Sequence, residues 1–417
     1  MAEYAVTLIP SPLGAAPARA TSINAKGQIV GYSYRPDNSY HGFLWDNGNV
    51  TDLGTLSGGH VSAASDINDA GQICGWSDAQ KLGPARAFLW HNGVMKDLGV
   101  IGGASSIAEA VNAAGEVAGE STVTEGVVHA FKWSNGVMHD LGALGGQYSR
   151  GHDINDAGDV VGDVGNTAFL HSGGSMVAIP SFQSAYAINN AGEIVGGPEA
   201  CFRDAMGNII PAPGVQGESV AASLNDSKRV VGWVYTEPSS VFAFRWDVAT
   251  QDFENLNDLV DPLDNGDTLA GAFDINQKGQ IVGHTAQGVP FLLTPILHTP
   301  DVSRLAYVTI LAGIIGGGGG IIRTPGGHIV PVPAPPEPWL RSSWNAMSPA
   351  KRDLLLGLAI DEVAALVADR RARREFRQAA RGLIQSSAVA IAGVQQPAAV
   401  GAAQRTQPRR SRKFERP

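Results

Sequence analysis

Residues 67–75 read Ile67-Asn68-Asp69-Ala70-Gly71-Gln72-Ile73-Cys74-Gly75, an Asn followed seven positions later by a Gly. The same spacing occurs seven times, at Asn24/Gly31, Asn68/Gly75, Asn112/Gly119, Asn155/Gly162, Asn189/Gly196, Asn225/Gly232 and Asn276/Gly283. The first and last Asn are 252 residues and six intervals apart, which gives 42 residues per unit. Repeats of this length are typical of β-propeller blades, so the repeat predicts the architecture before any single residue is interpreted.

Each unit predicts four short strands. In the second unit these are expected at residues 62–67, 72–75, 85–90 and 94–99, with turns at 68–71 and 91–93. An Asn folds its amide onto the backbone of such a turn, and a Gly accepts the positive φ that closes a hairpin. Four antiparallel strands in a meander make one propeller blade.

The two ends of the repeat region complement each other. The seventh unit stops after its third strand, at residues 291–294, whereas the chain begins with a strand-like segment, residues 4–10, that has no unit of its own. Joining them completes the last blade. The sequence therefore predicts an all-β fold, a seven-bladed β-propeller over residues 1–295 that is closed by its N-terminal strand.

Residues 128–142 read Val-His-Ala-Phe-Lys-Trp-Ser-Asn-Gly-Val-Met-His-Asp-Leu-Gly, and Leu-Gly-Gly follows at 144–146. This string, together with Asp-Ile-Asn-Asp-Ala-Gly at 153–158, resembles the HAF repeat, a family of bacterial and often extracellular repeat proteins. The resemblance covers about residues 4–295. It implies a propeller-like fold and a cell-surface location, and it assigns no defined biochemical role.

Charge is unevenly distributed along the chain. Residues 351–416 contain 14 basic and 6 acidic residues, whereas the remainder contains 16 basic and 33 acidic ones. An acidic body argues against nucleic-acid binding anywhere except at the tail. The first residues show no basic segment followed by an apolar one, so no signal peptide is predicted and a cytoplasmic location is favoured, in contrast to the extracellular one that the family resemblance implies.

Two acidic patterns suggest a metal or catalytic interpretation. Residues 66–71 and 153–158 are similar to the start of a calcium loop, but they offer too few oxygen ligands, so we favour turn capping and predict no metal and no cofactor. Asp66, Asp153 and Asp274 share one position in blades two, four and seven. Facing the channel, they would hold a cation or act as acid/base groups; hydrogen bonding to the adjacent turn is the alternative that we favour.

The units differ most between the second and third strands and between blades, in loops that share one face of a propeller. These segments are rich in aromatic residues, Arg and His, which make hot spots in binding interfaces. The candidate ligand-binding residues are Tyr32, Arg35, His60, Trp76, Tyr148, Arg150, His152, Tyr186, Trp233 and Tyr235. No catalytic residue is assigned.

Three further segments follow the repeats. Residues 296–347 are expected to form a Gly/Pro-rich β-hairpin and linker; residues 305–322 lack charge, but the glycine run at 316–320 disfavours a membrane helix, and membrane contact is left open. Residues 348–394 predict an amphipathic helical segment suited to self-association. Residues 395–417 predict a basic disordered tail.

The sequence favours a non-catalytic binding or scaffold module whose loop face takes a protein or glycan ligand. Two alternatives remain open at this point. One is a propeller hydrolase or lyase using the channel carboxylates Asp66, Asp153 and Asp274. The other is a structural or adhesive cell-surface protein.

Overall fold

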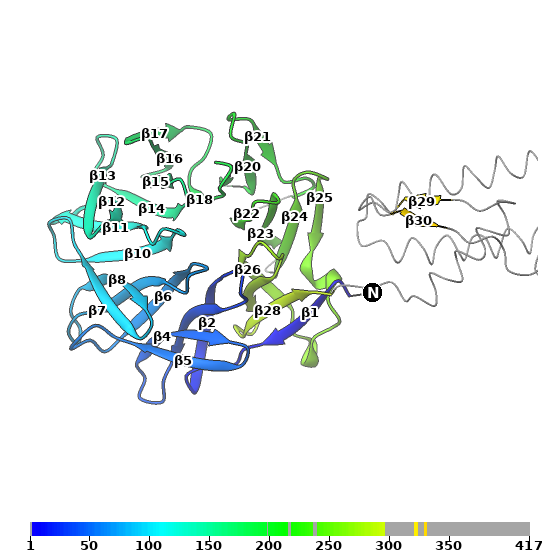
Figure 1. The fold of residues 1–417 in the computed structure, drawn as a ribbon, viewed down its shortest axis with the longest axis horizontal. Coiled ribbons are helices and arrows are strands. Elements are labelled where there is room, and N and C mark those ends of the chain that lie inside the picture. Colours follow the sequence, from blue (N-terminus) through cyan, green and yellow to red (C-terminus); the bar gives the residue numbers. More distant parts are fainter. Residues whose placement is uncertain are drawn as a thin grey trace, which may run out of the picture. The chain divides into compact units, whose positions relative to one another are not determined.

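The structure, a computed structural model, describes residues 2–197, 199–215, 218–236, 240–296, 321–323 and 329–331. Seven four-stranded antiparallel sheets surround a common axis, which confirms the seven-bladed β-propeller (Figure 1). The chain divides into one unit, Met1–Ile296, that contains the propeller, and a second unit, Leu297–Pro417. The two units are described separately.

Six blades use four consecutive strands in the order of the chain, from the axis outward, and the last blade uses β26, β27 and β28 followed by β1 (Figure 1). The innermost strands are β2 (Ala15–Ile23), β6 (Ser62–Ile67), β10 (Ser106–Val111), β14 (Ser149–Ile154), β18 (Ala185–Ile188), β22 (Ser219–Leu224) and β26 (Leu269–Ile275). The second strands are β3 (Ile29–Tyr34), β7 (Ile73–Asp78), β11 (Val117–Thr124), β15 (Val160–Val164), β19 (Ile194–Gly196), β23 (Arg229–Thr236) and β27 (Ile281–Thr285).

The outer half of each blade is built in the same way. The third strands are β4 (Tyr40–Asp46), β8 (Ala85–His91), β12 (Val127–Ser134), β16 (Thr167–Ser172), β20 (Cys201–Arg203), β24 (Ser240–Asp247) and β28 (Pro290–Pro295). The outermost strands are β5 (Asn49–Gly54), β9 (Val94–Gly99), β13 (Val137–Gly142), β17 (Ser175–Ile179), β21 (Ile209–Pro211), β25 (Asp252–Asn255) and β1 (Tyr4–Leu8). Two short 3₁₀ helices, η1 (Leu256–Leu259) and η2 (Asp264–Gly266), follow β25.

The N-terminal strand closes the ring, as predicted. β1 pairs antiparallel with β28, and the paired residues run from Tyr4 opposite Pro295 to Leu8 opposite Phe291. The Tyr4 ring is buried, and its hydroxyl accepts a hydrogen bond from Arg245 Nη1 at 3.0 Å. The last blade is therefore assembled from both ends of the repeat region.

The hydrophobic core lies between adjacent blades. One cluster joins Val30 and Leu53 of the first blade to Ala64, Phe88 and Trp90 of the second. The third-strand Phe that recurs in every unit is almost completely buried in all seven blades, at Phe43, Phe88, Phe131, Phe169, Phe202, Phe244 and Phe291. Burying one such side chain contributes about 1.5–3 kcal/mol, so the repeat preserves the contacts that hold the blades together.

Both ends of the Asn-to-Gly motif are fixed by backbone geometry. Gly71 has φ of 81°, and its N–H donates to the Asn68 carbonyl at 3.0 Å to close the turn. Gly75, seven residues after Asn68, has no room for a side chain, because a Cβ there would lie 2.1 Å from the Ala63 carbonyl oxygen. The constant residues of the repeat therefore serve folding.

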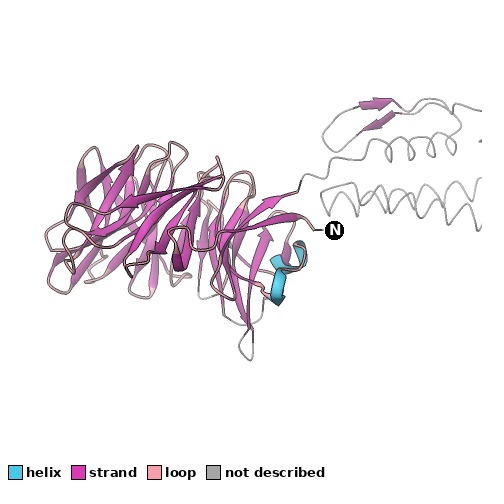
Figure 2. Cartoon of the chain, turned by 90° about the horizontal axis from the view of Figure 1, so that it is seen from below, coloured by secondary structure: helices cyan, strands magenta, loops and turns pink. Residues whose placement is uncertain are grey.

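Because successive strands of a blade are antiparallel, the turns between first and second strands and the connections between second and third strands lie at opposite ends of the strands, and Figure 2 shows connecting segments on both faces of the ring. We call the face with the turns between first and second strands the hairpin face. We call the face with the connections between second and third strands and between blades the loop face.

In the part of the chain that follows the propeller, Leu297–Pro417, β29 (Ile321–Arg323) comes directly after the glycine run and pairs antiparallel with β30 (Ile329–Pro331). The rest of the segment 297–347, the helical segment expected at 348–394 and the tail at 395–417 lie outside the described residues.

Candidate functional site

The Asn of each unit caps its own turn and also binds the next blade. Asn68 Oδ1 accepts the N–H groups of Ala70 and Gln72 at 3.1 and 3.0 Å. Its Nδ2 donates to the Asn112 carbonyl oxygen in the following blade at 2.8 Å. The sequence predicted the cap but not the bond between blades.

These bonds between blades form a closed ring on the hairpin face. The donors in ring order are Asn24, Asn68, Asn112, Asn155, Asn189, Asn225 and Asn276, and each bonds the carbonyl of the next. Their lengths lie between 2.8 and 3.4 Å, and the bond from Asn276 back to Asn24 closes the circle at 2.9 Å. All seven Asn residues are buried. Leaving such donors without partners would cost about 1–3 kcal/mol each.

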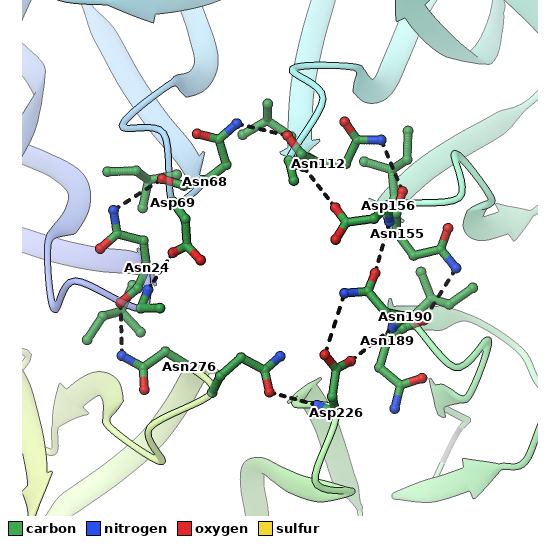
Figure 3. A pocket seen from close by; sticks show the side chains of 18 of the residues that line it. Asn24, Asn68, Asp69, Asn112, Asn155, Asp156, Asn189, Asn190, Asp226 and Asn276 are labelled. Carbon is green, nitrogen blue, oxygen red and sulfur yellow. Dashed lines mark hydrogen bonds between the residues drawn. The ribbon is translucent and has the colours of Figure 1, made fainter.

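A cavity of about 220 Å³ opens inside this ring (Figure 3). Three carboxylates stand around it, and each accepts a backbone N–H from the preceding blade. The bonds join Ala25 to Asp69 at 2.7 Å, Ala113 to Asp156 at 2.9 Å and Asn190 to Asp226 at 3.0 Å. The side chains around this mouth are thus engaged in holding blades together.

Asp66, Asp153 and Asp274 lie two residues before the ring Asn in the chain, and each joins two blades. Asp153 Oδ1 accepts the N–H of Ile154 at 2.7 Å, and its Oδ2 accepts the N–H of Ile188 in the next blade at 2.8 Å. The other two do the same, with Ile67 and Val111 bonded to Asp66, and Ile275 and Ile23 bonded to Asp274. The favoured expectation of a local hydrogen bond holds for all three, and the structure adds a second bond across the blade boundary.

Burial makes these carboxyls hard to ionise. Loss of hydration raises the pKa of Asp66 to about 6, and the nearby charge of Asp274 adds to the effect. Burial likewise raises the pKa of Asp153 to about 7. The pKa of Asp274 is raised by burial too, against the hydrogen bonds that favour its charged form.

A single hydroxyl joins two of these carboxyls. Ser22 Oγ lies 2.6 Å from Asp66 Oδ1 and 2.9 Å from Asp274 Oδ2. A hydroxyl has only one hydrogen to donate. Both contacts are hydrogen bonds only when one of the two carboxyls carries a proton, which agrees with their raised pKa values.

The expected binding residues lie on the loop side of the channel, but most are not in loops. Seven of the ten stand in strands: Tyr32 in β3, Trp76 in β7, Arg150 and His152 in β14, Tyr186 in β18, and Trp233 and Tyr235 in β23. Only Arg35, His60 and Tyr148 lie between strands. The expectation that loops carry these side chains is therefore wrong for seven of the ten, which stand in strands.

The first group is aromatic and spans blades one and two. The Tyr40 ring lies 5.8 Å from Tyr32, 5.4 Å from Tyr34 and 6.1 Å from Trp76, measured between centroids. All four rings are partly exposed. Such a group offers large apolar faces at low entropic cost to a ligand.

Arg35 and His60 are engaged close to this group. Arg35 lies 3.7 Å from a carboxylate oxygen of Asp37 and 3.6 Å from one of Asp52. The His60 backbone N–H donates to Asp78 Oδ1 at 2.6 Å.

The second group spans blades three to five and is polar. Arg150 Nε lies 2.5 Å from Glu120 Oε2, and its guanidinium stacks 4.9 Å from the centroid of Tyr148. His152 bonds Asp163 within its own blade, and its ring lies 5.8 Å from that of Tyr186.

The third group spans blades six, seven and one. The Phe273 ring lies 5.8 Å edge-on from Trp233 and 4.9 Å, stacked, from His284. The Arg19 guanidinium covers the other side of the Phe273 ring at 4.1 Å from its centroid. Burial lowers the pKa of His284, and the Arg19 charge acts in the same direction. Tyr235 stands apart from this group and is half exposed.

Sequence analysis missed Glu109, Glu120, Asp163, Phe273 and His284. Glu120, Asp163 and His284 follow the repeat Gly directly, which is the position of Tyr32, Trp76 and Trp233 in other blades. Glu109, like His152, Tyr186 and Phe273, occupies a β-bulge in an innermost strand, where the register shifts by one residue. Aligning the units at the repeat Gly would have identified the first set. The bulge falls three residues before the repeat Asn in every blade, but no single unit indicates it.

Comparison with other proteins adds fold similarity only. No protein-family profile and no curated protein sequence matches this chain. Among solved structures, a catalytically inactive virginiamycin B lyase from Staphylococcus aureus with quinupristin is similar, with a TM-score of 0.47 and 11% identity over 70% of this chain and 100% of that one. YCF48 bound to D1 peptide gives a TM-score of 0.44 and 10% identity over 70% and 97% of the two chains.

Among the residues that the structure describes, no helix is long and apolar enough to cross a membrane. The same part of the chain holds no group of three or more His, Cys, Asp or Glu residues arranged to bind a metal ion.

Proposed function

We propose that this chain is a non-catalytic binding or scaffold propeller that takes a protein or glycan ligand on its loop face. One observation carries the proposal: in six of the seven blades the residue after the repeat Gly has an aromatic, acidic or imidazole side chain, and its type varies from blade to blade. These residues are Tyr32, Trp76, Glu120, Asp163, Trp233 and His284; the fifth blade has Gly197. Variable aromatic and charged residues on a rigid scaffold are typical of recognition surfaces.

The alternative of a hydrolase or lyase has less support. Its candidate acids, Asp66, Asp153 and Asp274, have both carboxylate oxygens bonded to backbone N–H groups. A general acid must be within reach of substrate, and these bonds instead serve the contacts between blades. A structural or adhesive role at a cell surface, which the HAF-repeat resemblance suggests, would use the same loop face and is compatible with the proposal.

The test is a displayed-peptide selection and a glycan array with the full chain, repeated with a Trp76→Ala/Trp233→Ala variant. Both rings are partly exposed, and losing them is expected to weaken binding of any selected ligand at least tenfold. The matched control is Lys26→Ala/Lys278→Ala, two exposed residues in turns of the hairpin face. Unchanged binding by the tryptophan variant, or equal loss in both variants, would refute the assignment to the loop face.

A further inference from the structure

Glu109 differs from the other acidic side chains of the second loop-face group. Glu120 is paired with Arg150, and Asp163 bonds both His152 and Ser184. Glu109 is partly buried, and none of the described residues makes a hydrogen bond to its carboxylate. It is therefore the exception in a group whose other charges are matched.

The charges around Glu109 leave a negative excess. His152 and Arg150 attract its carboxylate, and Glu120 repels it. Arg150 is already engaged by Glu120, and His152 by Asp163. Three carboxylates thus share one guanidinium and one imidazole, and Glu109 is the one without its own partner.

Burying a carboxylate without a partner costs free energy, since the lost hydration is not replaced. Burial accordingly raises the pKa of Glu109. The β-bulge of β10 holds the residue in the channel wall, so the side chain is presented by a rigid strand. Features that cost stability in this way are concentrated at functional sites.

We propose that Glu109, with His152 and Glu120 beside it, binds the guanidinium or ammonium group of a basic side chain on a partner peptide. This inference rests on the proposed function and specifies its ligand. A cationic group supplies the missing partner through a charge-assisted hydrogen bond, which is stronger than a neutral one. Tyr148 already stacks against the Arg150 guanidinium, so the aromatic rings of this group suit planar cations.

The experiment uses the full chain and a fluorescein-labelled hexapeptide of alternating glycine and arginine, with binding followed by fluorescence anisotropy. The matched probe replaces arginine by citrulline, which has nearly the same shape and no charge. The wild-type chain is expected to bind the arginine peptide at least tenfold more tightly than the citrulline peptide. Equal affinity for the two probes, or no binding of either, overturns the proposal.

The matched variants are Glu109→Gln and Glu125→Gln, the latter in the exposed turn after β11. Glu109→Gln is expected to weaken the arginine peptide at least fivefold and Glu125→Gln to leave it unchanged. Because the first substitution removes a buried charge without a partner, its Tm is expected to stay equal or rise. A lowered Tm with retained affinity would assign Glu109 to the scaffold and overturn the proposal.

Two further arms separate the sources of failure. Competition by free arginine at the same concentration as the peptide would identify a small amine ligand and refute the peptide. Equal binding of both probes, combined with loss of binding in the Trp76→Ala/Trp233→Ala variant, would refute the cation site while leaving the loop-face function in place.

Discussion

The hairpin face and the loop face are built from the same seven units, yet they are under opposite constraints. On the hairpin face every unit places an Asn that makes the same bonds to its own turn and to the next blade. On the loop face the equivalent position after the repeat Gly holds, for example, Tyr32, Glu120, Trp233 and His284. One end of the blades repeats the same contact between neighbours, and the other end presents side chains that differ from blade to blade.

The largest expected effect tests closure itself. Deleting residues 2–10 removes β1, exposes the edge of β28 and uncovers the cluster that Tyr4 completes. We expect a loss of about 5 kcal/mol or more, or aggregation through the open edge, since burial of one large aromatic alone is worth about 3–5 kcal/mol. Thermal unfolding measures the loss, and a synthetic peptide of residues 2–10 should restore stability. An unchanged melting curve would contradict closure by β1.

Closure was also the feature that the sequence predicted best. The repeat spacing and the unpaired strands at its two ends specify blade number and connectivity, because a propeller has few ways to avoid an open edge. The bonds between blades could not be predicted, since the carbonyl that each Asn meets depends on how neighbouring blades pack. Asn112 and Asn155 are 43 residues apart, and nothing local to either one indicates their contact.

The sequence predicted which types of side chain lie on the loop face, but it did not predict that most of them stand in strands. Trp76 and Trp233 were expected in loops because aromatic residues lay near predicted strand ends. The actual strands extend further, to Asp78 and Thr236. Glu109 escaped notice because a β-bulge, which turns an extra residue toward the channel, has no signature in a single unit.

The second largest effect concerns the hairpin face. Asn112→Ala removes the acceptor for the N–H groups of Ala114 and Glu116, and the donor bonds to the Asn155 carbonyl and to Glu116 Oε2. We expect a loss of about 2–4 kcal/mol, since buried N–H and C=O groups are left without partners. Asn112→Asp keeps the acceptor but turns both donor contacts, with the Asn155 carbonyl and with Glu116 Oε2, into contacts between oxygens, so a loss at least as large is expected. Chemical denaturation compares the two; a clearly smaller loss in the Asp variant would mean that the donor contacts, including the bond to the next blade, add little.

The third effect is a pH dependence that arises in the channel. Asp66 and Asp153, with pKa values raised to about 6 and about 7, hold protons in the folded state that they release when unfolded. Their contribution to stability is therefore complete below about pH 4 and is lost as the pH rises through these values. For each carboxyl the slope within this window is about −1.4 kcal/mol per pH unit.

Asp153→Asn is the variant that tests this origin. An Asn side chain cannot ionise, so the dependence of the unfolding free energy on pH between about 4 and 7 should flatten, whatever the variant's absolute stability. Denaturation at three pH values measures the slope, and Glu125→Gln, in an exposed turn, serves as the control. A slope equal to that of the wild-type chain would show that Asp153 does not retain its proton.

The smallest expected effect on stability is at the loop face, and it tests the difference between the two faces most directly. Tyr235 is 51% exposed and lies near the end of β23. Tyr235→Ala is expected to change the free energy of unfolding by less than about 0.5 kcal/mol, because surface substitutions away from packed contacts rarely do more. The same variant should weaken a selected loop-face ligand, which anisotropy or calorimetry would detect. A loop-face substitution should therefore weaken binding without lowering stability. A substitution in the ring of Asn residues should instead lower the stability of the fold.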